Sequence, residues 1–408
     1  MTYSEAIDWL YSTQFFGIKL GLENPKRMLR EYLAFPPHRT KVIHVAGTNG
    51  KGSTCAFIDS VARATGTRTG LFTSPHLVRY SERIRVAGME ITEDEISRHL
   101  TALRELVADW DPHPTFFEIS LALALRHFSE RSCELVILET GMGGRLDATT
   151  AVPADVAVIT PISLDHQQWL GETLVEIAAE KAAIICHKKP TFSAPQEPAA
   201  RTIVEQVANE RYSTLEFIDE PLLGYSLGLS GEHQYNNAAL AMAALHAAGI
   251  TLRYETVKAG LSATNWTGRF EHIEPNLSKM NSPLVLDIAH NPAAAKALAA
   301  NWQREFGDRK ANLIFGAVES KDIAGILDAL LPIASQVHLV PVNSARGIAP
   351  TDLEQQFPAD HPPVEVHENL RDAFKVATLA PTLVTGSAFL VGEAKAIFTA
   401  SDHRASAQ

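Results

Sequence analysis

Short apolar segments alternate with longer amphipathic segments along the first half of the chain. The apolar segments have the length and composition of buried strands, and the amphipathic ones repeat apolar residues at helical spacing. The strands are expected at 41–47, 133–141 and 155–163, and the helices at 53–66, 116–131 and 172–186. Apolar strands that alternate with helices indicate a parallel sheet covered on both faces. The pattern therefore predicts an α/β fold.

One helix boundary in this half carries a specific sequence feature. Thr92 is followed three residues later by Glu95, and an amphipathic segment continues to about residue 108. A threonine and a glutamate at this spacing form a capping box, in which each side chain accepts a hydrogen bond from the other residue's backbone N–H. We expect a helix that begins at Glu93.

The alternation of strand-like and helix-like segments becomes less regular after about Pro190. It resumes beyond a turn-rich segment near residues 264–282. In this second part, strands are expected at 282–290, 311–318, 336–342 and 388–392, and helices at 293–306, 323–335 and about 369–380. We place a domain boundary near Trp266. The expected domains are residues 1–266 and a smaller α/β domain at 267–408.

Composition narrows the functional classes. The 408 residues carry a formal net charge of −11, which disfavours a nucleic-acid partner because phosphates would be repelled. Neither a signal peptide nor an apolar run long enough for a membrane span is recognisable, so we expect a cytoplasmic protein. Three widely spaced cysteines, Cys55, Cys133 and Cys186, are expected to be reduced thiols rather than disulfides or zinc ligands.

A glycine-rich loop follows the first strong strand. Its residues are Gly47, Thr48, Asn49, Gly50, Lys51, Gly52 and Ser53. Glycines let backbone N–H groups approach phosphate oxygens, the lysine adds a positive charge, and the start of the following helix favours an anion. The loop differs from the common G-x-x-x-x-G-K-[ST] pattern. We predict nucleotide phosphate binding, with a structural tight turn as the alternative.

Polar residues also follow two other strong strands. Glu139 precedes three closely spaced glycines, Arg145 and Asp147, and the pair Asp165 and His166 follows the next strand. Parallel sheets bind ligands at the carboxyl ends of their strands, and carboxylate with imidazole suits Mg²⁺ or Mn²⁺. The structural alternatives are a glycine turn held by an Arg145–Asp147 pair and a histidine without a ligand role.

Other candidate residues are ambiguous when taken singly. Ser74 precedes a proline and could be a simple loop serine. Lys181 lies in an alanine-rich helix, where it could pair with Glu176 or Glu180 in solvent, or face a site where desolvation makes its amine reactive. Asp287 and His290 end an apolar strand of the second domain. Residues Asn237 and Arg269 carry no distinctive pattern of their own.

Seven motifs then occur together in one order: AGTNGKGS, TSPHLVRYSERIRV, LETGMGGRLDATT, LDHQQWLGETLVEIAAEKAAII, YNNAALAMAAL, GRFE and DIAHNP. With them the chain resembles the dihydrofolate synthase/folylpolyglutamate synthase family, a branch of the Mur ligases, from Gly21 to Ala394. The resemblance implies a P-loop-containing Mur-ligase-like ATPase domain with a mainly parallel sheet, which also binds pteroate or folate. It implies a smaller Rossmann-like C-terminal domain that binds glutamate.

The resemblance also implies roles for individual residues. The positions that match ATP-binding residues of the family are the glycine-rich loop, Asn237, Arg269, Asp287 and His290. Positions Ser74, Glu139 and His166 match magnesium ligands, and Lys181 matches a lysine that is carbamylated and helps to hold a second Mg²⁺. The catalytic set implied is Lys51, Lys181, His166 and Arg269. The pteroate-binding residues implied are Phe117, Glu118, Ser120, Arg145, Leu146 and Asp147.

The implied reaction joins L-glutamate to dihydropteroate, to reduced folates or to both. ATP would phosphorylate the acceptor carboxylate, and the glutamate amine would displace phosphate from the acyl phosphate, leaving ADP and phosphate. The expected ligands are small molecules, with no membrane or nucleic-acid partner, and the resemblance suggests a monomer. Two alternatives stay open: a Mur-type amino-acid ligase acting on another carboxylate, and an ATP-dependent switch protein that forms no bond.

Overall fold

The computed structural model describes residues 1–16, 21–274, 277, 282–377 and 380–399. The chain divides into two compact units. The first consists of Met1–Ser74, Ser81–Gly228 and Gln234–Thr264, and the second of Pro75–Tyr80, Leu229–His233 and Asn265–Gln408. The main division lies between Thr264 and Asn265, and two short segments that precede it in sequence belong to the second unit.

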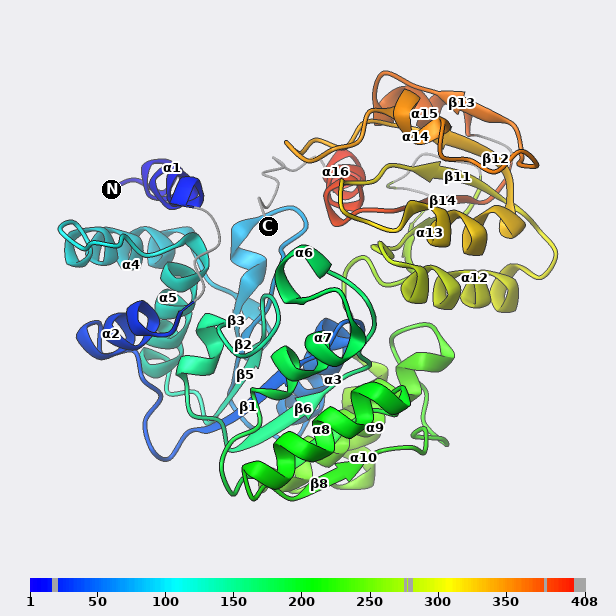
Figure 1. The fold of residues 1–408 in the computed structure, drawn as a ribbon. Helices are drawn as coiled ribbons and strands as arrows, with labels where there is room; N and C mark the ends of the chain where they lie inside the picture. Colours follow the sequence, from blue (N-terminus) through cyan, green and yellow to red (C-terminus); the bar gives the residue numbers. More distant parts are fainter. Residues whose placement is uncertain (17–20, 275–276, 278–281, 378–379, 400–408) are drawn as a thin grey trace. The chain divides into compact units, whose positions relative to one another are not determined.

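An eight-stranded sheet, with the order β4-β3-β2-β5-β1-β6-β7-β8, organises the first unit (Figure 1). Six of its strands run parallel, and β3 and β4 form an antiparallel edge. The strands are β1 (Lys41–Ala46), β2 (Thr69–Phe72), β3 (Ile84–Val86), β4 (Met89–Glu90), β5 (Leu135–Glu139), β6 (Val156–Ile159), β7 (Thr191–Ser193) and β8 (Leu215–Phe217).

The helices of this unit follow the predicted alternation. They are α1 (Tyr3–Ser12), α2 (Glu23–Glu31), α3 (Lys51–Ala64), α4 (Glu93–Leu106), α5 (Phe116–Glu130), α6 (Gln167–Leu170), α7 (Leu174–Ala182), α8 (Pro198–Glu210), α9 (Glu232–Ala247) and α10 (Tyr254–Ser262), with short 3₁₀ turns η1 (Thr13–Phe16), η2 (Tyr80–Arg83) and η3 (Ala148–Ala151). The capping box predicted for α4 is confirmed, because Thr92 and Glu95 each accept a backbone N–H of the other.

Helix α3 is buried along most of its length because it packs on β1, β2 and β5 and is covered by α10. Its close packing on α10 depends on a glycine: a Cβ at Gly260 would lie 2.6 Å from the Cα of Val61. The hydroxyl of Ser60 donates a hydrogen bond of 2.7 Å to the Gly260 carbonyl. The helix that begins at the glycine-rich loop is therefore packed against the sheet on one side and α10 on the other.

The second unit is built on a six-stranded sheet with the order β13-β12-β11-β14-β10-β9, in which only β9 is antiparallel to its neighbour. The strands are β9 (Glu271–Ile273), β10 (Leu284–Leu286), β11 (Ala311–Phe315), β12 (Ala334–Leu339), β13 (Val364–Val366) and β14 (Thr382–Thr385). The helices are α12 (Pro292–Phe306), α13 (Ile323–Leu330), α14 (Pro350–Glu354), α15 (Leu370–Val376) and α16 (Ala388–Thr399), with a 3₁₀ turn η4 (Leu331–Ile333).

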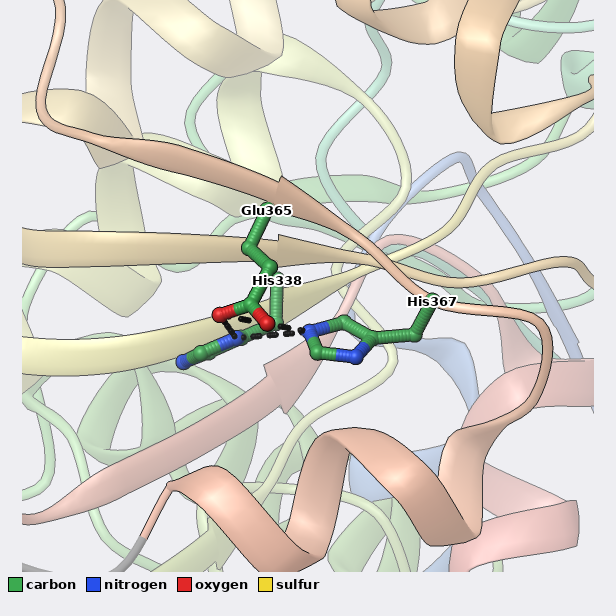
Figure 2. A group of neighbouring side chains, drawn as sticks. All are labelled: His338, Glu365 and His367. Carbon is green, nitrogen blue, oxygen red and sulfur yellow. Dashed lines mark hydrogen bonds and ion pairs between the residues drawn. The ribbon is translucent and has the colours of Figure 1, made fainter.

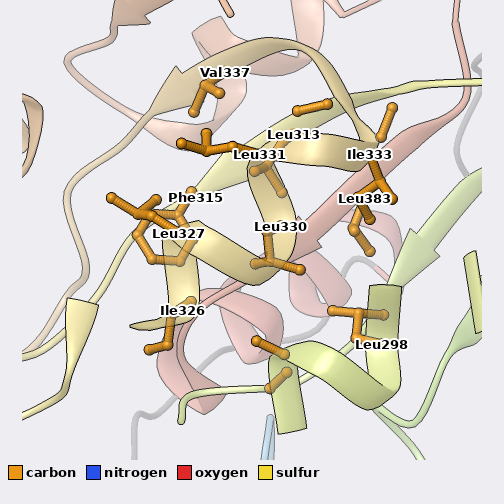
Figure 3. Close-up of a cluster of buried hydrophobic side chains, with 14 of the residues drawn as sticks. Leu298, Leu313, Phe315, Ile326, Leu327, Leu330, Leu331, Ile333, Val337 and Leu383 are labelled. Atoms are coloured by element: carbon orange, nitrogen blue, oxygen red, sulfur yellow. The ribbon is translucent and has the colours of Figure 1, made fainter. Parts of the chain in front are cut away.

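Alternate residues of β11 pack into two separate apolar cores, one on each face of this sheet. Leu313 and Phe315 of β11 pack with α13 in one core (Figure 3), whereas Ile314 between them joins α16 in the other. Successive strand residues point to opposite faces, so one apolar run serves both cores. The predicted α/β class with two mainly parallel sheets is confirmed.

One predicted element is wrong. Residues 388–392 were expected to form a strand, but they begin helix α16, and the strand is the preceding segment Thr382–Thr385. A short apolar run does not distinguish a buried strand from the start of a buried helix. The helix expected at about 369–380 runs from Leu370 to Val376, and residues 378 and 379 lie outside the described part of the chain.

None of the helices among the described residues combines the length and apolar character needed to cross a lipid bilayer.

Candidate active site

Three loops of the first unit leave the carboxyl ends of neighbouring strands. Strands β5, β1 and β6 are adjacent and parallel in the sheet. The Glu139 loop follows β5, the glycine-rich loop follows β1, and the Asp165–His166 loop follows β6. Strand pairing aligns Val45 with Glu139 and Ala46 with Ile159. The residues that sequence analysis selected at three strand ends thus belong to one edge of one sheet.

The glycine-rich loop is closely packed where glycine is required. Gly47 and Gly50 have φ values of 148° and 88°, which residues with a Cβ rarely adopt. A Cβ at Gly47 would lie 1.9 Å from the hydroxyl oxygen of Thr160, and one at Gly50 would lie 2.6 Å from Oδ1 of Asn237. The loop therefore approaches Thr160 and Asn237 more closely than a side chain at either glycine permits.

Hydrogen bonds join this loop to the segment after β6. The backbone N–H groups of Thr48 and Asn49 both donate to the Pro161 carbonyl, at 2.9 and 3.2 Å. The hydroxyl of Thr48 exchanges hydrogen bonds of 3.0 Å with the backbone of Ser163. Helix α3 then begins at Lys51 without a side-chain cap at Gly50. The start of the helix keeps its partial positive charge, which suits an anion.

Two lysines meet at a single carbonyl of the loop. Lys51 Nζ donates to the Gly47 oxygen at 3.1 Å, and Lys181 Nζ donates to the same oxygen at 3.0 Å. Lys181 is buried, so it is not a solvent-exposed helix lysine; its neighbour Glu180 pairs with Arg145, and Glu176 caps α7. Its burial, with Lys51 adding to the effect, lowers the pKa of Lys181 to about 7. Its amine is therefore partly neutral near pH 7.

Glu139 and Ser74 are neighbours at the same strand ends. Glu139 is buried at the end of β5, and its Oε2 accepts the Ser74 backbone N–H at 3.1 Å. This bond orients the carboxylate beside the segment that follows β2. A hydroxyl and a carboxylate are oxygen ligands of the kind that Mg²⁺ and Mn²⁺ prefer, so these two residues fit a divalent metal.

His166 has a strained backbone and an accessible side chain. Its φ is 53°, it precedes α6, and its side chain is 41% exposed. Nε2 lies 4.0 Å from Oδ2 of Asp165, and the Asp165 carboxylate accepts the His166 N–H at 2.8 Å. Asp165 also acts electrostatically on Lys181, opposing the fall in its pKa. Asp165, which was not among the predicted metal ligands, thus lies beside His166 and also acts on the charge of Lys181.

The loop after β5 is organised by Asp147. This buried carboxylate accepts backbone N–H groups from Met142 at 2.9 Å and from Thr149 at 3.0 Å. Its burial raises its pKa and these hydrogen bonds oppose the rise. The alternative of a turn held by an Arg145–Asp147 pair is wrong, because Arg145 binds Glu180 at 2.7 Å.

The predicted pteroate-binding residues divide into two groups. Half-buried Phe117 packs against the Asp147 loop, since a Cβ at Gly141 would lie 2.8 Å from its ring and 3.2 Å from Asp147. Leu146 is also half-buried. By contrast, Glu118 completes the capping box of α5 with Thr115, and the Ser120 hydroxyl donates to the Phe116 carbonyl at 2.8 Å. Both of these side chains therefore have a local structural function.

In the second unit, Asp287 receives two backbone hydrogen bonds. The N–H groups of Phe270 and Ala289 donate to its two carboxylate oxygens, each at 2.8 Å. Burial raises the pKa of Asp287, whereas the charge of Arg269 opposes that rise. His290 Nδ1 lies 2.9 Å from the Ile288 carbonyl. The structure thus brings Arg269, Asp287 and His290 into one neighbourhood of the second unit.

Sequence reasoning missed two residues close to these groups. Thr160 lies directly against Gly47. The strand was expected to run to residue 163, so the sequence did not mark Thr160 as a residue that follows a strand end. His233 has an exposed side chain in the second unit, where desolvation and the charges of Arg269 and Arg304 lower its pKa to about 4. No sequence pattern distinguished His233, because it lies in the first turn of α9 outside any recognised motif.

Comparison with known proteins decides the family. The model of the Mur ligase middle domain matches residues 45–218, and that of the Mur ligase glutamate ligase domain matches residues 268–389. A dihydrofolate synthase/folylpolyglutamate synthase of Escherichia coli is 35% identical over 347 residues, which cover 81% of this chain and 79% of that protein. The chain belongs to the dihydrofolate synthase/folylpolyglutamate synthase family. It is therefore an enzyme of the ATP-dependent ligase class.

Solved structures of this family agree over almost the whole chain. FolC of E. coli in complex with DHPP and ADP is 30% identical, with a TM-score of 0.86 over 97% of this chain and 98% of that one. A bifunctional folylpolyglutamate synthase/dihydrofolate synthase of Yersinia pestis, complexed with AMPPNP and a Mn ion, is 31% identical, with a TM-score of 0.85 over 97% and 98% of the two chains.

Proposed function

We propose that this enzyme joins L-glutamate to dihydropteroate, to reduced folates or to both, in a reaction that consumes ATP and forms an acyl phosphate. The observation that carries the proposal is the meeting of Lys51 and Lys181 at the Gly47 carbonyl, at the strand edge that also holds Glu139. The relatives that bind ADP, AMPPNP and Mn, and the match to a glutamate ligase domain, support it.

Particular residues are proposed to act in the binding of ATP and in the transfer of its terminal phosphoryl group. The loop glycines and the start of α3 bind the phosphates, and Lys51 offsets charge on the transferred group. Transfer of the terminal phosphoryl group to the acceptor carboxylate replaces a poor leaving group, oxide, with phosphate. The glutamate amine then attacks the acyl carbon, and phosphate departs. Arg269, Asp287 and His290 are proposed to contribute to nucleotide binding.

Metal binding is proposed for Ser74, Glu139 and His166. Bound Mg²⁺ would neutralise phosphate charge, as divalent ions do in phosphoryl transfer. Asp165 lies beside His166 and is proposed to orient its imidazole, since metal-bound histidines commonly use such a carboxylate partner.

We further propose that Lys181 is carbamylated and contributes to holding a second Mg²⁺. A neutral lysine amine attacks CO₂, forming an N–C bond and releasing a proton to water. The burial of Lys181 and its pKa of about 7 favour the neutral form that this step requires. Isotopically labelled bicarbonate should give a carbamate carbon signal in the wild-type protein that is missing from Lys181→Met. A signal of equal size in both would contradict the assignment.

The substrate assignment is tested with a panel of acceptors. Enzyme, ATP and Mg²⁺ are mixed with dihydropteroate, a reduced folate or a cell-wall precursor carboxylate, with and without glutamate. ADP release should require glutamate and one of the first two acceptors, and the product should be heavier by one glutamyl residue. Lys51→Ala should abolish both signals while the far-ultraviolet circular dichroism stays unchanged. The enzyme is proposed to act as a monomer, which light scattering during turnover would test.

Two results would replace this proposal. Turnover with only the cell-wall precursor would favour a Mur-type ligase of other specificity. Steady ADP release without any acceptor would favour a nucleotide-dependent switch protein.

A further inference from the structure

Two histidines and a glutamate lie together at the edge of the second unit's sheet. His338 belongs to β12, whereas Glu365 and His367 come from the edge strand β13 and the residue just beyond it. Parallel pairing aligns His338 with Glu365, and the His367 N–H donates to the Leu339 carbonyl at 2.9 Å. Residues two apart on a strand point to the same face, so the three side chains converge (Figure 2).

The three potential ligand atoms are separated by distances close to those of a metal site. His338 Nδ1 lies 2.9 Å from His367 Nε2 and 3.8 Å from Glu365 Oε2, and His367 Nε2 lies 3.9 Å from the same oxygen. Around a tetrahedral zinc ion with bonds of about 2.0–2.1 Å, ligand atoms are about 3.3 Å apart. Side-chain shifts of about half an ångström would therefore produce that geometry.

The His338 imidazole is enclosed beside the other two side chains. It is 1% exposed, and its Nε2 makes no hydrogen bond within the described residues. The Gln336 amide donates to Glu365 Oε2 at 3.4 Å and orients the carboxylate.

We propose that His338, Glu365 and His367 form a binding site for a divalent transition-metal ion of the Zn²⁺ class. Two imidazole nitrogens and one carboxylate oxygen suit zinc or cobalt and disfavour Mg²⁺ and Ca²⁺, which prefer oxygen ligands. Three protein ligands leave a fourth position open to water or an external ligand. Among the described residues, this is the one group of three His, Cys, Asp or Glu side chains whose ligand atoms all lie within 4.8 Å.

The position in the sheet indicates how the ion enters and what it does. The Glu365 side chain is 47% exposed, whereas both imidazoles are buried, so the ion reaches the site from the carboxylate side. Strand β13 has only three residues and pairs with β12 alone. A bound ion would cross-link β13 to β12 and stabilise the edge of this unit. The proposal concerns residues outside the phosphate loop and does not depend on the catalytic assignment.

The full chain, stripped of metal with a chelator, is titrated with Co²⁺ in a large excess of Mg²⁺, which occupies oxygen-rich sites. We expect one Co²⁺ per chain with visible ligand-field absorption, displaced by Zn²⁺, and a higher thermal unfolding midpoint when Zn²⁺ is present. Glu365→Gln and His367→Gln should each weaken binding by at least about tenfold and remove the stabilisation by Zn²⁺.

Glu368→Gln is the matched control, since it removes the same charge from an exposed residue three positions beyond Glu365. It should bind Co²⁺ as the wild type does. Should His367→Gln fail to fold, the exposed Glu365 still provides the test. The proposal is overturned if no stoichiometric Co²⁺ absorption develops, or if Glu365→Gln binds Co²⁺ as tightly as the Glu368→Gln control.

Discussion

At the scale of single residues, the glycine-rich loop depends on two separate properties of Gly50. Its φ of 88° strains any residue with a Cβ, and a Cβ there would lie 2.6 Å from Asn237. We predict that Gly50→Ala lowers stability and raises the KM for ATP at least about tenfold, because the loop or Asn237 must move. Equilibrium unfolding and initial rates against ATP concentration measure the two effects.

Gly66 is a control position that tests backbone strain without steric crowding of an added Cβ. It has the same φ of 88°, at the other end of α3, but a Cβ there would meet nothing within 4 Å. Gly66→Ala should therefore lower the free energy of unfolding by about 1 kcal/mol and leave the KM for ATP unchanged. Equal effects of the two substitutions on KM would contradict a close fit of the loop around phosphate.

Lys181 should make stability depend on pH in alkaline solution. Its pKa falls from 10.5 in the unfolded chain to about 7 in the fold, so between these values the unfolded chain binds more protons. The free energy of unfolding should therefore rise with pH from about 7 to about 10, by a few kcal/mol in total. Below pH 7 both states are protonated and the cost of burying the charge is felt in full.

Lys181→Met should lack this rise, because methionine carries no proton to release. Urea unfolding of both proteins in CO₂-free buffer, at several pH values across that range, makes the comparison. Parallel stability profiles for the wild type and Lys181→Met would show that Lys181 titrates normally in the fold.

Glu139 is expected to act through its charge. Its Oε2 accepts the Ser74 N–H, and glutamine keeps an oxygen able to accept that bond. Glu139→Gln should therefore fold normally but reduce kcat by at least about a hundredfold, since a neutral amide is a poor ligand for Mg²⁺. Steady-state kinetics over a range of Mg²⁺ concentrations, with a thermal melt as the control for folding, would measure this. A near-normal kcat would exclude Glu139 as a metal ligand.

Sequence position selected candidate residues at strand ends better than it indicated their contacts. Gly47 and Asp165 come after buried strands that the pattern predicted, and Glu139 is the last residue of another. Thr115 and Glu118 have the same capping-box spacing that predicted the start of α4, so the local function of Glu118 could have been recognised from the sequence. The backbone hydrogen bonds of Asp147 depend on the path of its loop, and no spacing rule describes them.

At the scale of elements, the capping box of α4 gives a local test of stability. The Thr92 side chain accepts the Glu95 N–H, and alanine cannot. Thr92→Ala should lower the free energy of unfolding by about 1 kcal/mol without changing kcat. Denaturant titration measures it. Thr202→Ala, on the exposed face of α8, removes a hydroxyl that caps no helix and should be neutral or slightly stabilising. A similar loss in both variants would exclude capping as the cause.

Element prediction failed where segments were short. Strands β4, β9 and β13 have two or three residues each, too few for an alternating pattern to be recognised. Helix α16 begins with an apolar run that resembles a strand, and its buried residues include Leu390, Val391 and Ala394. In both cases tertiary packing, which the local pattern does not contain, decides the secondary structure.

At the scale of the whole molecule, two α/β units each have their own sheet and their own apolar cores. The repeated alternation of strand and helix predicted this duplication. The short segments Pro75–Tyr80 and Leu229–His233 belong to the second unit although they precede the main division. A boundary drawn at one point of a sequence cannot describe such segments, because their assignment depends on contacts between residues distant along the chain.

In the proposed mechanism, the acceptor carboxylate is phosphorylated before glutamate attacks it. An acceptor whose carboxylate carries a heavy oxygen isotope tests this order of steps through mass analysis of the phosphate released during turnover. We expect one heavy oxygen in each phosphate, in equal amount to the glutamylated product. Unlabelled phosphate formed alongside that product would contradict it.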